Sequence, residues 1–91
     1  MFQLQDFMEE HGGTPQEWFA GIASNPEKKL FNHHRVDRKN GAWIYRLAAS
    51  PDAAREVLDA LVATGCETQP DPAEFEGTLV YVYLKSEQTR P

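Results

Sequence analysis

The 91-residue chain contains a single cysteine, Cys66, so it cannot form an internal disulfide bond. It has no apolar run close to the roughly 18 residues that a membrane-spanning helix needs. Its first residues have neither a basic start nor an apolar core, so the sequence shows no secretory signal. Because a lone cysteine favours a reducing compartment, we expect a cytoplasmic protein without a membrane partner.

Sequence patterns that support catalysis or cofactor binding are also scarce. The glycine pair Gly12-Gly13 precedes Thr14-Pro15, and this proline removes an amide that a phosphate-binding loop would use. Cys66 follows the expected end of a helix, where the partial negative charge disfavours a thiolate. His33 and His34 are neighbours on an expected strand, so their side chains point to opposite faces and cannot share one metal ion. We therefore expect no catalytic residue, no metal and no cofactor.

Length and composition predict one α+β domain over residues 1–91. A chain of this size buries roughly 60–65% of its unfolded surface, which allows one core. Apolar residues make up 41% and aromatic residues 11% of the chain, enough for a core without metals or disulfides. We expect a helical hairpin in residues 1–26, a sheet with one helix in residues 27–85, and a frayed tail in residues 86–91.

Two short helices are expected before the sheet. Within residues 3–11, apolar side chains recur at the spacing of one helix face. Thr14-Pro15 with Glu17 is a capping signature, and it predicts a second helix that ends at Asn25-Pro26.

A β-hairpin is predicted from residues 29–36 and 42–49, because Asn40-Gly41 between them suits a type I′ turn. In this register Arg38 faces Trp43 and Arg35 faces Arg46. The register also places His34 on the core face and His33 on a solvent-exposed, basic face.

The strongest local signals lie in the second half of the chain. Ser50-Pro51 and Gly65 bound a helix over residues 51–64. Residues 78–85 are apolar or aromatic on both faces, which is typical of a central strand, and we place it beside residues 42–49. With a short strand at residues 66–69 and a helical turn at residues 71–74, the prediction is two N-terminal helices followed by ββαββ, with a mainly antiparallel sheet of three to four strands packed on helices.

Positive charge gathers in residues 27–46, which hold six of the nine Lys and Arg residues, although the whole chain carries a net charge of −5. Opposed like charges repel, so an acidic partner would stabilise Arg35 beside Arg46. We therefore expect a small acidic protein that acts as a non-catalytic binding or regulatory module and contacts a protein partner through a basic hairpin. The expected contact residues are Arg35, Arg38, Lys39, Arg46 and His33.

Other readings of the same surface stay open. Cations beside Trp43 and Tyr45 also fit a single-stranded nucleic-acid binder. An exposed strand edge would allow self-association. The enzyme alternative is a small histidine-dependent enzyme or enzyme subunit built around His33 or His34.

Overall fold

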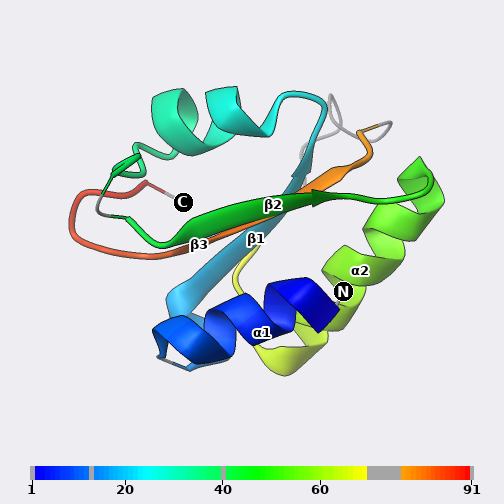
Figure 1. The fold of residues 1–91 in the computed structure, drawn as a ribbon, viewed down its shortest axis with the longest axis horizontal. Helices are drawn as coiled ribbons and strands as arrows, with labels where there is room; N and C mark the ends of the chain where they lie inside the picture. The colour runs from blue at the N-terminus through cyan, green and yellow to red at the C-terminus, as the bar shows by residue number, and fades with distance from the viewer. Residues whose placement is uncertain (1, 13, 40, 70–76, 91) are drawn as a thin grey trace.

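The structure, a computed structural model, describes residues 2–12, 14–39, 41–69 and 77–90, and it shows a small α+β protein. Three strands form an antiparallel sheet in the order β1-β3-β2, with β1 at Trp18–Ala23, β2 at Trp43–Leu47 and β3 at Leu79–Leu84. Helices α1 (Phe2–His11) and α2 (Pro51–Thr64) lie on one side of the sheet, and the π-helix η2 (Lys28–His33) lies on the other (Figure 1).

The central strand β3 confirms the prediction made from its apolar residues. Val80 and Val82 belong to the core under α1 and α2, whereas Tyr81 and Tyr83 belong to a second core under η2. All four side chains are buried, because a strand with a layer on each side alternates its residues between two cores. Its neighbour β2 is the strand expected from residues 42–49, and Tyr45 pairs with Tyr81.

The short helix expected in residues 3–11 and the helix expected in residues 51–64 are both present, as α1 and α2. The Ser50 hydroxyl accepts a hydrogen bond from the Ala53 N–H at 3.1 Å, which caps α2, and Gly65 ends it with a φ of 122°. Leu61 of α2 and Leu4 of α1 are buried in the same core, so both helices are held by the face that their sequence periodicity predicts.

The predicted second helix is wrong, because most of its residues form β1. The Thr14-Pro15 signature starts only a 3-10 turn, η1 (Pro15–Glu17), and Thr14 makes no side-chain cap. Trp18 and Phe19 then face opposite cores, each 1% exposed. Pairing with β3 along six residues buries both faces of this segment, and a short helix could bury only one.

The predicted β-hairpin is also wrong, because its first half is η2. Asn25-Pro26 does not end a helix; the Asn25 side chain accepts a hydrogen bond from the Lys28 N–H at 3.2 Å, and a helical turn follows. Leu30 is fully buried against the aromatic side chains under η2. Asn40 lies outside the described residues, while Gly41 does not have the positive φ that a type I′ turn requires.

The ββαββ order is therefore replaced by β1, η2, β2, α2 and β3. The strand expected at residues 66–69 contributes one parallel bridge, between Glu67 and Phe19, at the outer edge of β1. The helical turn expected at residues 71–74 lies outside the described residues. Residues 86–90, for which we expected fraying, approach η2, where the Arg90 N–H donates to the His34 carbonyl at 2.7 Å.

Candidate functional site

A basic surface lies over the η2 side of the sheet. We call it the basic layer and define it as Lys28, Lys29, His33, Arg35, Arg38 and Lys39. All of these side chains are exposed except Lys29, which is half-buried. Residues 27–39 carry five Lys and Arg side chains against two acids, Glu27 and Asp37, so this layer is strongly positive.

The opposite layer has the opposite charge. Helices α1 and α2 together carry six acids and one cation, Arg55. The six acids are Asp6, Glu9, Glu10, Asp52, Glu56 and Asp59. The sheet separates the two layers, so the charge is polarised from one face of the sheet to the other (Figure 1).

The structure does not bring all the predicted contact residues together. His33, Arg35, Arg38 and Lys39 belong to η2 and the segment after it, but Arg46 lies on β2. Arg46 pairs with Val80 in the register, which places it on the face of α1 and α2 rather than opposite Arg35. Its guanidinium donates to the Tyr45 carbonyl at 2.8 Å. Because Arg46 lies on the other face of the sheet, it is separate from the basic layer.

The positive charge of Arg38 is partly compensated by contacts within the molecule. Its guanidinium lies 4.0 Å from the centre of the Phe31 ring, rather than on Trp43 as the hairpin register predicts. It is also 3.9 Å from a Glu27 carboxylate oxygen, yet its side chain remains 61% exposed. Glu27 accepts a hydrogen bond from the Tyr45 hydroxyl at 3.1 Å, and this bond raises the pKa of Tyr45.

Arg35 has an unusual backbone conformation. Its φ is 58°, in the left-handed region that glycine favours, and among the described residues it is the one non-glycine residue with a positive φ. This conformation ends η2 and lets the Val36 N–H donate to the Leu30 carbonyl at 2.8 Å. A non-glycine residue in the left-handed region costs roughly 1–2 kcal/mol.

A buried histidine lies directly beneath the basic layer. His34 is 4% exposed, and its Nδ1 is 2.7 Å from the Arg90 carbonyl oxygen. A carbonyl can only accept, so Nδ1 carries the proton and Nε2 accepts from the Tyr81 hydroxyl at 2.9 Å. Burial lowers the pKa of His34, the positive charges of His33 and Lys29 lower it further, and the Arg90 carbonyl opposes them. His34 is therefore neutral at pH 7.

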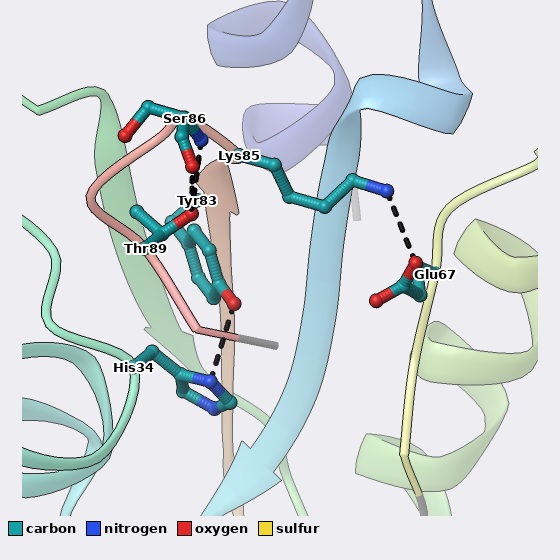
Figure 2. A network of polar contacts seen from close by, with 6 residues as sticks. All are labelled: His34, Glu67, Tyr83, Lys85, Ser86 and Thr89. Carbon is teal, nitrogen blue, oxygen red and sulfur yellow. Dashed lines mark hydrogen bonds and ion pairs between the residues drawn. The ribbon is translucent and has the colours of Figure 1, made fainter.

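Two tyrosines of β3 complete this network. The Tyr83 hydroxyl is 3.2 Å from His34 Nδ1 (Figure 2), and burial raises the pKa of Tyr83. Tyr81 lies across its strand partner Gly21, where an added Cβ would meet the ring carbon Cε1 at 2.8 Å. Sequence analysis did not connect these residues, and the one available signal was that Tyr81 and Tyr83 alternate onto a single face.

Further along the sheet, Lys85 and Glu67 form an ion pair at 3.1 Å, also visible in Figure 2.

Cys66 is buried, and burial raises the pKa of its thiol, which opposes thiolate chemistry. Within the part of the chain that the structure describes, no group of three or more His, Cys, Asp or Glu side chains could hold a metal ion. None of the helices described is long and apolar enough to cross a membrane.

No known protein family, curated protein or solved structure matches this chain. A functional interpretation therefore depends on the geometry of its own residues.

Proposed function

We propose that this protein is a small non-catalytic binding or regulatory module of the cytoplasm, and that its basic layer contacts an acidic surface on a protein partner. The observation that carries the proposal is the separation of charge by the sheet, with a positive layer over η2 and a negative layer formed by α1 and α2. Such polarity steers and orients an approaching partner of opposite charge, and it disfavours contact through the acidic layer.

The backbone at Arg35 supports the same surface. Glycine would occupy this position with less strain, but the position holds a long, exposed cation of the basic layer. A strained residue at an exposed position is a reason to suspect function. Arginine is also the cation best suited to a bidentate contact with a partner carboxylate.

The His34 network supports a non-catalytic role. Both ring nitrogens are already engaged, Nδ1 by the Arg90 carbonyl and Nε2 by the Tyr81 hydroxyl. A general acid or base needs one nitrogen within reach of its substrate. We therefore infer that His34 holds η2 and the C-terminal segment on the sheet. This geometry favours the binding module over the histidine-dependent enzyme.

Affinity capture from a lysate of the source organism tests the proposal. The bait pair is wild type and the double variant Arg35→Glu/Lys39→Glu, which reverses two exposed cations of the basic layer. The matched control is Arg46→Glu, an exposed cation outside that layer. We expect a protein retained by wild type and by the control but lost with the double variant, whose thermal unfolding should stay close to that of wild type. A partner retained by all three baits would exclude the basic layer as the interface.

Single-stranded nucleic acid is the second candidate. The rings of Phe31 and Trp43 meet edge to face with 4.8 Å between their centroids, and the Arg38 guanidinium lies over the Phe31 ring. Cations and aromatic rings therefore occur together at the edge of the basic layer. A labelled oligonucleotide titrated at ~50 mM salt and upward separates the two candidates. Binding that weakens steeply with salt would favour nucleic acid, and no binding at the lowest salt would remove it.

A further inference from the structure

The two edges of the sheet differ in whether their backbone is covered. At the outer edge of β1, the Glu67 N–H donates to the Trp18 carbonyl and the Glu67 carbonyl accepts from the Ala20 N–H, both at 2.9 Å. Among the residues that the structure describes, β2 pairs with β3 alone and has no such neighbour on its other side. Figure 1 shows β2 in front of β3 and β1, with η2 above it and α1 and α2 below it. The edge formed by β2 is therefore the open one in the described part of the chain.

The strand register shows which backbone groups reach this open edge. The Leu84 N–H donates to the Ala42 carbonyl at 2.9 Å, so the even-numbered residues of this segment direct their backbone groups toward β3. The odd-numbered residues direct theirs outward, and they are Trp43, Tyr45 and Leu47. The Tyr45 carbonyl accepts from the Arg46 guanidinium, and its oxygen has a second lone pair for another donor. Another strand can therefore pair with β2 without breaking any hydrogen bond to β3.

The side chains of the same three residues form an apolar row on the η2 face. Trp43 and Tyr45 stack with 6.2 Å between their ring centroids, and both pack against the core under η2. Leu47 continues the row past that core and is 74% exposed. Edge strands are commonly protected by a lysine or a proline, and β2 contains neither. An apolar row on an open strand edge is the surface that a further strand covers.

The charges beside this edge have both signs. On the η2 face, Arg38 lies 3.9 Å from a Glu27 carboxylate oxygen. Arg46 lies on the opposite face, where α1 packs on β2 and carries the exposed acids Asp6, Glu9 and Glu10. A segment of a single charge gains little from such an edge, whereas a copy of the same surface brings the complementary sign. The balance of charge therefore favours a second copy of the chain over an acidic or basic segment.

We propose that a second copy of this chain pairs antiparallel with β2 about a two-fold axis at Tyr45, so that the two sheets become one continuous sheet. Tyr45 then faces Tyr45 of the other copy and Trp43 faces Leu47, and each of these pairs exchanges two backbone hydrogen bonds. The exposed Leu47 is covered by the Trp43 ring of the other copy. Ile44 faces Arg46, which brings this cation to the acidic face of the other copy. The contact goes beyond the proposed protein contact, because it uses the edge of the sheet rather than the cations of the basic layer.

Sedimentation equilibrium of the full chain, from about 10 µM to 1 mM at pH 7.5, tests the pairing. A contact along one short strand is small, so we expect a weak dimer that exchanges with the monomer. The average mass should rise with concentration from the 10.3 kDa of one chain toward twice that value. The ¹⁵N spectra should shift over the same range at the amides of Trp43, Tyr45 and Leu47. An average mass that stays at 10.3 kDa at 1 mM would overturn the proposal.

Variants at exposed aliphatic residues locate the contact. Leu47→Pro removes an outward N–H and leaves the ladder to β3 intact, since an edge strand accepts proline where its N–H faces solvent. We expect it to raise the dissociation constant by more than about tenfold, and Leu47→Ser, which keeps the N–H, to raise it about tenfold. Val62→Ser is the matched control, because Val62 is an exposed aliphatic residue of α2 away from the edge. Unchanged self-association in both Leu47 variants, or its loss with Val62→Ser, would place the contact elsewhere and overturn the proposal.

An isotope-filtered NOE experiment on mixed labelled and unlabelled chains tests the register. Within one chain, Trp43 and Leu47 are about 13 Å apart along the strand, so an NOE between the indole ring and the leucine methyls must come from the other copy. We expect this NOE at 1 mM, and its absence from a self-associating sample would overturn the pairing about Tyr45.

Partner capture separates this proposal from the proposed function. The Arg35→Glu/Lys39→Glu protein should lose the captured protein and self-associate as wild type does, whereas Leu47→Pro should do the reverse. Each proposal can therefore fail without the other. A captured protein that is lost with Leu47→Pro, from a wild type that stays monomeric at 1 mM, would assign the β2 edge to a strand of another protein and overturn the pairing of two copies.

Discussion

Replacing Tyr81 with phenylalanine removes one hydroxyl and leaves a buried nitrogen of His34 without its partner. The Tyr81 hydroxyl donates to Nε2 at 2.9 Å, and both side chains are only 4% exposed, so water cannot easily replace the bond. Tyr83 supplies a matched comparison, because its hydroxyl is 3.2 Å from Nδ1, which also has the Arg90 carbonyl at 2.7 Å. The same Tyr→Phe change thus leaves one nitrogen unpaired in the first variant and none in the second.

The expected magnitudes follow from this difference. A buried acceptor that loses its only partner costs about 1–3 kcal/mol, so we expect Tyr81→Phe to lower the free energy of unfolding by about 2 kcal/mol. A hydrogen bond whose partner stays satisfied contributes about 0.5–1.5 kcal/mol, so the loss in Tyr83→Phe should lie near 1 kcal/mol or below. Losses of this size are measurable against the roughly 5–15 kcal/mol typical of a small domain.

Urea unfolding at pH 7.5, followed by tryptophan fluorescence, measures both losses. The slope of the free energy of unfolding against urea concentration should be the same in the two variants and wild type, since the surface exposed on unfolding is unchanged. The Tyr81 hydroxyl donates only to unprotonated Nε2, so its removal should also raise the pKa of His34 in an NMR titration. Equal losses in the two variants, or a larger loss with Tyr83→Phe, would refute the assignment of the proton to Nδ1.

The other predictions concern stability at four separate positions. Because burial holds the pKa of His34 below its ordinary value of 6.5, the unfolded chain takes up the proton first as the pH falls. The contribution of neutral His34 to the free energy of unfolding should be complete above pH 6.5 and should decline below it by at most about 1.4 kcal/mol per pH unit. Urea titrations at pH 7.5 and 5.5 measure this decline. Arg35→Gly should keep or raise the stability by up to about 1 kcal/mol in a thermal melt, because glycine accepts the positive φ, and a clear loss would contradict the strain argument. Ser50→Ala should cost about 1 kcal/mol by removing the α2 cap, with Ser50→Asp retaining most of the stability. Gly21→Ala should cost about 1–3 kcal/mol in urea, because its Cβ would push the buried Tyr81 ring off β1.

Local signals were sufficient where they agreed with the tertiary packing. Ser50-Pro51 and Gly65 mark both ends of α2, and the burial of Ala54 and Leu61 follows the predicted helix face. The pattern in β3 was equally informative, since successive residues belong alternately to the two cores. In both elements the turn chemistry, the periodicity and the burial point to one structure.

Local signals failed where they fitted two structures equally well. Asn25-Pro26 can follow a helix or begin one, and the hydrogen bond from the Lys28 amide to the Asn25 side chain shows that it begins one here. Trp18 and Phe19 suit one side of a short helix or the two faces of a strand. The second arrangement forms because β3 offers a six-residue partner, and that partner is some 60 residues away in the sequence.

The sequence by itself determined the α+β class, the helix α2, the central strand β3 and the surplus of positive charge in residues 27–46. Only the tertiary structure decided that most of this charge lies in the π-helix η2 and the segment after it, and that Arg46 lies apart from this layer. It also decided the surroundings of His34, whose partners Tyr81 and Arg90 are 47 and 56 residues away. The physical reason is that capping, periodicity and turn chemistry act over a few residues, whereas the pairing of strands and the contacts of a buried side chain depend on which distant segments the core brings together.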